Sequence, residues 1–165
     1  MGLEHIDFEP FDRRDRKRVE ECAALMSGSE PWITLRRTYD DAVKIITEET
    51  SEVHLAKLGD EMIGFAIIRM HGAFIGYIQS IVVKSQYRGQ GIGRRFMQYL
   101  EQRIFREQPN VFICVSSFNP DAKRLYEGLG YKMIGELRDY IVRGHSEILM
   151  RKTISPLSEF TNGSK

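Results

Sequence analysis

Hydrophobic spacing predicts two helices in the amino-terminal third of the chain. Residues 3–8 alternate weakly between apolar and polar positions, which favours a short opening strand. Apolar residues then recur at helical spacing over residues 12–28, which form the first predicted helix. Thr38, followed three residues later by Asp41, is typical of a helix start and predicts a second helix over residues 39–46. The expected buried positions are Val19, Cys22, Ala23 and Met26 in the first helix and Tyr39, Ala42, Val43 and Ile46 in the second.

The middle of the chain changes to apolar runs that are typical of strands. We expect strands over residues 53–58, 62–70 and 73–83. Gly59 and Asp60 favour a hairpin turn between the first two, and a second glycine-containing turn precedes the third. Strands joined by such short turns are antiparallel neighbours, so this region predicts an antiparallel meander.

The last third of the chain alternates helices with strands. Residues 92–107 carry an apolar stripe every four residues and predict an amphipathic helix. A short continuous apolar run at 111–115 predicts a central buried strand. An Asn-Pro pair opens a predicted helix over residues 119–130, and strands are expected at 131–137 and 145–152. This order predicts an α/β protein of the α+β kind, with a mixed, mostly antiparallel sheet of about seven strands and helices on both faces.

Composition limits the number of domains and the kinds of partner. The 165 residues, of which 42% are hydrophobic, suffice for one core, so we expect one domain at 1–154 and a flexible tail at 155–165. Twenty-four basic residues against 23 acidic ones leave a charge of +1, which does not favour nucleic acid or a membrane surface as a partner. The basic run at 13–18 is interrupted by an acidic residue and lacks aromatics, which favours a solvated helix face over a nucleic-acid patch. Whether the protein forms a homodimer is left open.

The cysteines and the absence of long apolar segments favour a cytoplasmic protein. Cys22 and Cys114 lie in apolar stretches and lack the spacing of a metal site, so no metal is expected. Their small number fits a reducing compartment. We also expect no signal peptide and no transmembrane segment, because no apolar run has the required length.

The glycine-rich segment 86–93, Gln-Tyr-Arg-Gly-Gln-Gly-Ile-Gly, is the main chemical signal. Glycine permits a sharp turn there and lets a ligand approach main-chain amides. The first N–H groups of a helix lack internal partners and carry the positive end of its dipole, so a phosphate is favoured beside them. Arg88 adds a full positive charge. The same glycines also suit a tight strand-to-helix connection without any ligand, and the turn alone leaves both interpretations open.

The spacing of the glycines argues against dinucleotides and nucleoside triphosphates. A dinucleotide fingerprint requires Gly-x-Gly-x-x-Gly, but Arg94 stands where the third glycine belongs. The next strand runs into Ser116 and Ser117, without the expected carboxylate. A triphosphate loop needs Gly-Lys followed by Ser or Thr, and this segment lacks it.

The pattern Arg88-x-x-Gly91-x-Gly93, after a strand and at the start of a helix, resembles the signature of the GCN5-related N-acetyltransferase (GNAT) family. The order of elements over residues 52–152 resembles that family as well, and the run 125–131 resembles its second coenzyme-side helix. Residues 138–145 bear a faint resemblance to ribosomal-protein amino-terminal acetyltransferases. The resemblance implies an acyl-CoA N-acyltransferase fold and transfer of acetyl from acetyl-CoA to a primary amine by direct attack in a ternary complex.

The resemblance also implies roles for particular residues. A splay between the fourth and fifth strands would expose an amide near Val82 or Val83 to the thioester carbonyl. Tyr126 matches the family tyrosine that protonates the departing sulfur, and a phenol with a pKa of about 10 suits a thiolate of about 8.5. Packing in the core is its alternative role. The expected coenzyme-binding residues are Ile81, Val82, Val83, Arg88, Gly89, Gln90, Gly91, Ile92, Gly93, Arg94 and Asn119.

The general base and the acceptor are less constrained. Cys114 stands where relatives that acetylate protein amino termini carry a glutamate, and packing is favoured over a nucleophilic role for this cysteine. The acceptor is expected to be a peptide amino terminus or a small amine, and a non-catalytic acyl-CoA-binding regulatory module is the alternative function. The expected substrate-side residues, among them the candidates for the base, are Glu30, Trp32, His145 and Glu147.

Overall fold

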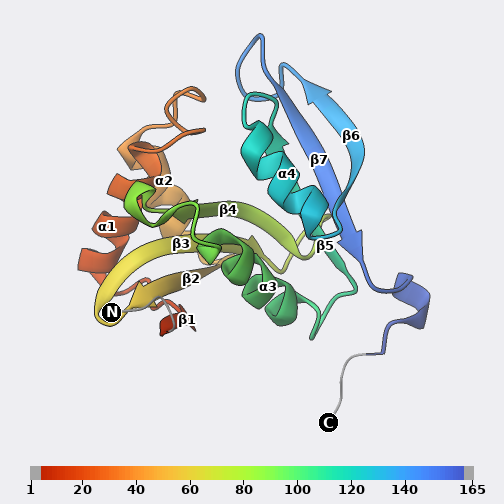
Figure 1. The fold of residues 1–165 in the computed structure, drawn as a ribbon, viewed down its shortest axis with the longest axis horizontal. Coiled ribbons are helices and arrows are strands. Elements are labelled where there is room, and N and C mark those ends of the chain that lie inside the picture. Colours follow the sequence, from red (N-terminus) through yellow and green to blue (C-terminus); the bar gives the residue numbers. More distant parts are fainter. Residues whose placement is uncertain (1–4, 162–165) are drawn as a thin grey trace.

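A twisted seven-stranded sheet forms the centre of the structure, a computed structural model that describes residues 5–161 (Figure 1). Its strands are β1 (Ile6–Pro10), β2 (Ser51–Leu58), β3 (Glu61–Arg69), β4 (Tyr77–Val83), β5 (Asn110–Ser116), β6 (Lys132–Arg138) and β7 (Ser146–Thr153). They follow the order β1-β2-β3-β4-β5-β7-β6, and every neighbouring pair is antiparallel except β4 and β5, which are parallel. The predicted mixed, mostly antiparallel sheet is confirmed.

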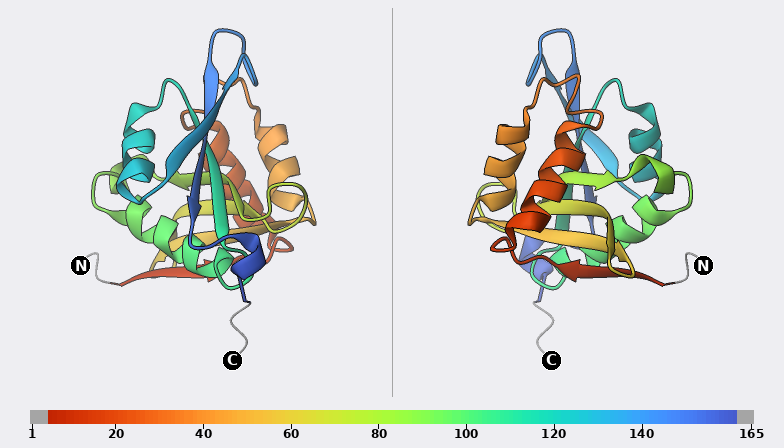
Figure 2. Two further views of the ribbon diagram at one scale, coloured as in Figure 1. Left: turned by 90° about the vertical axis from the view of Figure 1, so that its right-hand side faces the viewer. Right: turned by 90° about the vertical axis from the view of Figure 1, so that its left-hand side faces the viewer.

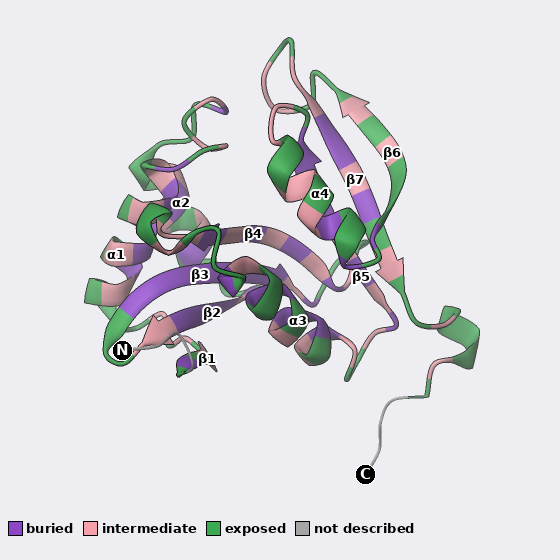
Figure 3. Ribbon diagram, viewed as in Figure 1, coloured by how far each residue is buried: buried purple, intermediate pink, exposed green. Residues whose placement is uncertain are grey.

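Helices cover both faces of the sheet, as predicted. The helices are α1 (Arg16–Ser27), α2 (Tyr39–Thr47), α3 (Ile92–Ile104) and α4 (Pro120–Gly128), with short 3-10 turns η1 (Ser85–Tyr87) and η2 (Leu157–Glu159). Helices α1 and α2 share one hydrophobic cluster with β2 and β3, whereas α3 and α4 share a second cluster on the other face (Figures 1 and 2). Strand β3 is buried along most of its length, while the edge strand β6 is largely exposed (Figure 3). The division into a domain at 1–154 and a tail at 155–165 stays a prediction.

Side-chain caps fix where the helices begin. Thr38 and Asp41 form the predicted reciprocal cap of α2: the Asp41 N–H donates to Thr38 Oγ1 at 3.1 Å, and the Thr38 N–H donates to Asp41 Oδ2 at 2.8 Å. Helix α1 begins later than predicted, because Asp15 is its cap and accepts the N–H of Arg18 at 3.2 Å. The predicted first-turn Tyr39 of α2 is 41% exposed, so the expectation that it is buried was wrong. The buried stripe of α2 consists of Ala42 and Ile46.

The predicted strand over residues 73–83 begins four residues late. Residues 71–76 form a loop, in which Gly72 and Gly76 adopt positive φ angles of 96° and 85°. A Cβ at Gly76 would lie 2.4 Å from the carbonyl oxygen of Asn110, so the close approach of two chain segments requires glycine. At the other end of the sequence, the predicted strand at 3–8 corresponds to β1, and residues 3 and 4 lie outside the described residues.

Candidate active site

A groove with a volume of about 1350 Å³ opens where β4 and β5 separate. The two strands are paired only at Tyr77↔Phe112 and Ile78↔Ile113 and diverge beyond these residues. In Figure 1, β4 lies between α1 and α2 on one side and α4 on the other. The groove is lined by the α1–α2 loop, β4, the glycine-rich turn, β5, α4 and the β6–β7 loop. The predicted splay is therefore present, and it joins the glycine-rich turn to the substrate side.

A β-bulge in β4 accompanies this separation. Ile78 pairs with Ile68 of β3, whereas Ser80 pairs with the adjacent Ile67, so Gln79 is an extra residue without a partner of its own. Such a bulge bends its strand and shifts the phase of the residues that follow. Gln79 lies at the point where the pairing with β5 ends.

The phase after the bulge decides which main-chain groups of β4 face the groove. The N–H of Lys84 donates to a β3 carbonyl at 2.8 Å, so strand alternation directs the main chain of Val82 toward β3 and that of Ile81 and Val83 toward the groove. The Val83 carbonyl agrees with this phase, because it accepts the Nε–H of Arg88 at 2.8 Å. Of the two amides expected near a thioester carbonyl, the geometry favours Val83 over Val82.

The amino terminus of α3 has the form of an anion cradle. Gly91 is the N-cap in the left-handed conformation (φ 79°) and supplies no side-chain cap, and the first turn contains no acidic residue. The first intrahelical bond runs from the Arg95 N–H to Gly91, which leaves the N–H groups of residues 92–94 without helical partners. No atom lies within 4 Å of a Cβ placed at Gly89 or Gly91, so a ligand can approach these amides closely.

The other predicted coenzyme residues surround this turn. Arg88 and Arg94 line the groove, and the Arg94 side chain also reaches the carbonyl of Gly128 at 3.4 Å. The Ile92 side chain is buried and anchors α3, so only its main-chain amide is available to a ligand. The Nε2 of Gln90 donates to a carbonyl within the turn at 3.1 Å. Asn119 lines the groove and uses its Oδ1 to cap α4.

Tyr126 projects from α4 into the core on the α3 and α4 face and reaches the groove. Its side chain is 6% exposed, and burial raises the pKa of its hydroxyl above the ordinary phenol value. The ring lies 6.0 Å from that of Tyr131, between centroids. Within the described residues its hydroxyl makes no hydrogen bond, so it can donate to a ligand atom in the groove.

Glu147 lies on β7 with its side chain on the opposite face of the sheet from Tyr126. It pairs in register with Ser116 of β5, whose Oγ donates to its Oε1 at 2.6 Å. Glu147 is 5% exposed but lines the groove, and burial raises the pKa of its carboxyl. Tyr77 and Cys114 lie close to each other and to Glu147, and burial raises the pKa of both groups. One face of the groove therefore carries the buried carboxyl of Glu147, and the other carries the phenol of Tyr126.

The remaining predicted substrate residues are placed less favourably for proton transfer. The carboxylate of Glu30 lines the groove but accepts two hydrogen bonds from Thr34, at 3.1 Å from its N–H and 3.0 Å from its hydroxyl. Trp32 is half-buried in the groove wall. His145 packs edge-on against Phe118 with ring centroids 4.8 Å apart and does not line the groove.

Sequence reasoning missed Tyr77 as a site residue and assigned no role to the side chain of Ser116. Both join Glu147 only through pairing between strands that are distant in the sequence. Residues 111–115 were expected to be buried throughout, whereas burial alternates along β5 and leaves Cys114 half-exposed to the groove. An alternating pattern would have been the signal, but Phe112 and Cys114 are apolar and hide it.

The described residues contain no cluster of three or more residues able to hold a metal ion. Across residues 5–161, none of the helices combines the length and apolar character needed to cross a membrane. Cys22 is a buried free thiol, and Cys114 is a partly exposed one.

Comparisons with known proteins give the family. The model of the acetyltransferase (GNAT) family matches residues 19–131. The chain is 28% identical over 158 residues to the N-alpha-acetyltransferase RimI of Mycobacterium tuberculosis, a match that covers 90% of this chain and 93% of that protein. Sheet, glycine turn and family match together define an acyltransferase, and the chain belongs to the GNAT family of acetyltransferases.

Solved structures share the fold. The ribosomal-protein-alanine N-acetyltransferase from Escherichia coli has a TM-score of 0.72 at 20% identity, covering 95% of this chain and 99% of that chain. An aminoglycoside 6'-N-acetyltransferase complexed with coenzyme A has a TM-score of 0.73 at 21% identity, covering 91% of this chain and 98% of that chain. The predicted fold and family are thus confirmed.

Proposed function

We propose that the protein transfers the acetyl group of acetyl-CoA to a primary amine by direct attack in a ternary complex. The observation that carries the proposal is the uncapped amino terminus of α3, which opens into the same groove as the free edge of β4. The cradle fits a diphosphate, because glycines leave the space beside its amides open and Arg88 adds positive charge. Acetyl-CoA supplies the activated acyl group as a thioester.

The free edge of β4 accounts for activation of the acyl group. The N–H groups of Ile81 and Val83 point into the groove and can donate to a carbonyl oxygen that becomes negative during attack. Such a donor is worth about 3 kcal/mol in other acyl transfers. The diphosphate cradle lies at the end of the same strand, so the pantetheine arm would run along β4 between the two.

Two groups on opposite faces of the sheet account for the proton transfers. Glu147 is the best-placed general base, because its buried carboxylate has a raised pKa and Ser116 fixes its orientation. Tyr126 would protonate the departing thiolate from the α4 side, and its position in the groove lining supports this role. The amine would lose its proton to Glu147 on one face, and the thiolate would gain a proton from Tyr126 on the other face. The two proton transfers therefore use separate groups.

The acceptor end of the groove favours a peptide amino terminus. Trp32 of the α1–α2 loop and Tyr140 and Ile141 of the β6–β7 loop give it apolar walls, and the RimI relative acts on alpha-amino groups according to its name. A small amine such as an aminoglycoside is the second candidate, because the chain also shares its fold with an aminoglycoside acetyltransferase. We expect the protein to act in the cytoplasm, and its two free thiols support a reducing compartment.

The test is a screen of peptides and small amines with acetyl-CoA, in which released thiol is measured, together with calorimetric titration of coenzyme A. Acetylation of an amine with coenzyme binding in the micromolar range supports the proposal. Gly91→Glu is the matched control, because it places a carboxylate in the cradle and should abolish binding while the chain stays folded. Binding without turnover across the whole panel would favour a non-catalytic acyl-CoA-binding module. No binding at all would overturn both functions.

A further inference from the structure

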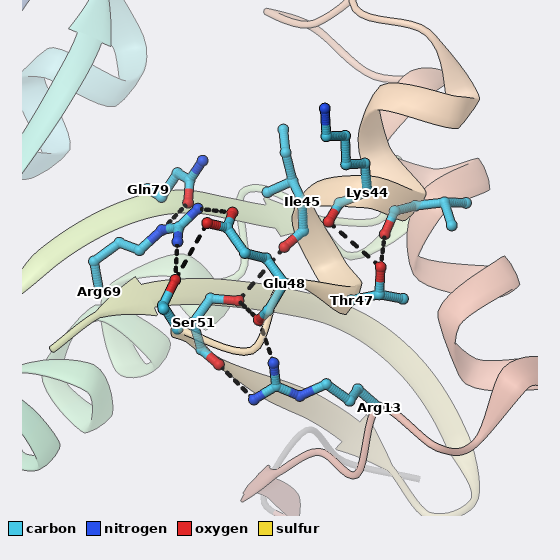
Figure 4. Close-up of polar contacts among 10 residues, drawn as sticks. Arg13, Lys44, Ile45, Thr47, Glu48, Ser51, Arg69 and Gln79 are labelled. Atoms are coloured by element: carbon cyan, nitrogen blue, oxygen red, sulfur yellow. Dashed lines mark hydrogen bonds and ion pairs between the residues drawn. The ribbon is translucent and has the colours of Figure 1, made fainter. Parts of the chain in front are cut away.

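Arg69, at the end of β3, makes three polar side-chain contacts around the β4 bulge (Figure 4). Its Nε donates to Oε1 of the bulged Gln79 at 2.7 Å. Its Nη1 donates to Thr50 Oγ1 at 2.8 Å, and its Nη2 contacts Glu48 Oε2 at 2.5 Å. The segment that follows α2 thus fixes the guanidinium, which also binds Gln79, the residue of β4 that has no pairing partner on β3.

The bulge has a measurable effect on the orientation of β4. Without it, strand alternation would place Val82 on the same face as Ile78, which packs in the α3 and α4 cluster. Instead Val82 is buried in the α1 and α2 cluster, while Ile81 and Val83 pack on the α3 and α4 side. One extra residue has therefore inverted the phase of the strand, and the same inversion turns the main-chain groups of Ile81 and Val83 into the groove.

A bulge of this kind needs an interaction that favours the extra residue. If Gln79 moved into register with β3, the phase of every later residue would change and the buried side chains of β4 would exchange faces. The amide oxygen of Gln79 accepts a charge-assisted bond from a guanidinium whose orientation is already fixed by two other acceptors. Ordering that bond costs little additional side-chain entropy, because Arg69 is only 20% exposed.

We propose that Arg69 is a positioning residue for acetyl transfer, which acts through Gln79 to hold the bulge that turns the N–H groups of Ile81 and Val83 toward the thioester. This inference rests on the proposed function, because the thioester is the group that those amides would serve. It assigns a role to a side chain that lies outside the groove lining and touches neither substrate.

The test compares Arg69→Ala with Arg13→Ala in the full chain. Arg13 also binds the segment between α2 and β2, because it donates to the main-chain carbonyls of Glu48 and Ser51 (Figure 4). It does not contact Gln79. Both variants should lower the Tm. Only Arg69→Ala should lower kcat, by about tenfold or more, because misdirected amides lose part of the roughly 10²–10³-fold effect of an oxyanion donor. The KM for acetyl-CoA should stay unchanged within about twofold. Hydrogen exchange should accelerate in β4 of this variant alone.

A double-mutant cycle completes the test. Arg69→Ala, Gln79→Ala and the double variant should show similar losses of kcat, because each breaks the same contact. Equal kcat in Arg69→Ala and Arg13→Ala, or additive losses in the cycle, would overturn the positioning role. A wild-type protein that binds no coenzyme and acetylates no amine would overturn the proposed function instead. Unchanged exchange in β4 of Arg69→Ala would count against the positioning role without any need for an acceptor.

Discussion

Glu147 carries a carboxylate that is buried and yet faces the groove, as a general base requires. Its raised pKa means that kcat/KM should rise with pH through a value above the ordinary carboxyl range, because only the ionised form accepts a proton. Glu147→Gln should lower kcat by about 10²–10⁴ and remove this inflection. The pH profile of kcat/KM is the measurement, and Glu30→Gln is the matched control that keeps the inflection. Retention of the inflection in Glu147→Gln would exclude Glu147 as the base.

Replacement of Glu147 by glutamine should also raise the stability of the folded protein. A carboxyl whose folded pKa is raised favours folding while it is protonated, and that contribution is lost as pH rises through the folded pKa. Glu147→Gln removes the buried charge while an amide oxygen can still accept from Ser116. The variant should therefore unfold at a higher temperature than the wild type at pH 8, by an amount that shrinks at acidic pH. A lower Tm at pH 8 would contradict this account.

Replacement of Tyr126 should lower the rate of the chemical step without weakening the binding of coenzyme A. Tyr126→Phe removes a hydroxyl that makes no hydrogen bond within the described residues, so packing in the core should be kept. We expect kcat to fall about 10²-fold or more while the Kd for coenzyme A stays nearly constant. Stopped-flow or steady-state kinetics with calorimetry measure the two quantities. Equal losses in kcat and affinity, or no loss, would assign this residue to packing.

Among the elements, the start of α3 makes the requirement for glycine testable at two neighbouring positions. Gly91 has a φ of 79°, so Gly91→Ala should cost about 1–2 kcal/mol of unfolding free energy and weaken coenzyme binding. Gly93 is within the helix, and a Cβ there would make an ordinary contact with Leu125 at 3.6 Å. Gly93→Ala should therefore stabilise the protein by up to about 1 kcal/mol and keep coenzyme binding. Urea unfolding and titration calorimetry distinguish the two, and a reversed order of stabilities would refute the assignment.

Elements with strong local signals could be predicted from the sequence. The cap at Thr38, the Asn-Pro start of α4 and the glycine turn are each contained in a few consecutive residues, and each lies where it was expected. The start of β4 could not be predicted, because Ala73 to Gly76 are apolar and resemble a strand although residues 73–76 form a loop, in which Gly76 permits the close approach to Asn110. Apolarity alone does not distinguish a loop that packs on a neighbour from a strand.

The candidate site could be predicted only in its contiguous part. The amides of the glycine turn follow one another in the chain, and the family resemblance supplied Tyr126. The base could not be chosen, because Glu147 meets Ser116 only through the pairing of β5 with β7. The phase of β4 was also hidden, since the bulge at Gln79 depends on a contact with Arg69 ten residues earlier in the chain.

At the scale of the whole molecule, the alkylation rates of the two cysteines measure two different properties. Cys22 measures unfolding of the core, and Cys114 measures access to the groove. Cys22 is fully buried, and burial raises the pKa of its thiol to about 12, so it should react only after unfolding. Cys114 lines the groove with a raised pKa, so alkylation should be slow at pH 7 and should accelerate with pH. Coenzyme A should slow that reaction. Mass spectrometry of alkylated protein measures each site, and labelling of Cys114 that is indifferent to coenzyme A would show that the coenzyme does not occupy this groove.

Because β4 and β5 separate, the groove between them is open to both faces of the sheet. The groove is lined from the α4 side by Leu125 and Tyr126 and from the other side by Trp32 and Ile45. If acetyl-CoA and the amine use this groove as proposed, they can approach the reacting atoms from opposite faces of the sheet at the same time. A single compound that links coenzyme A to a peptide amine would then lie across the sheet and occupy both sides of the groove.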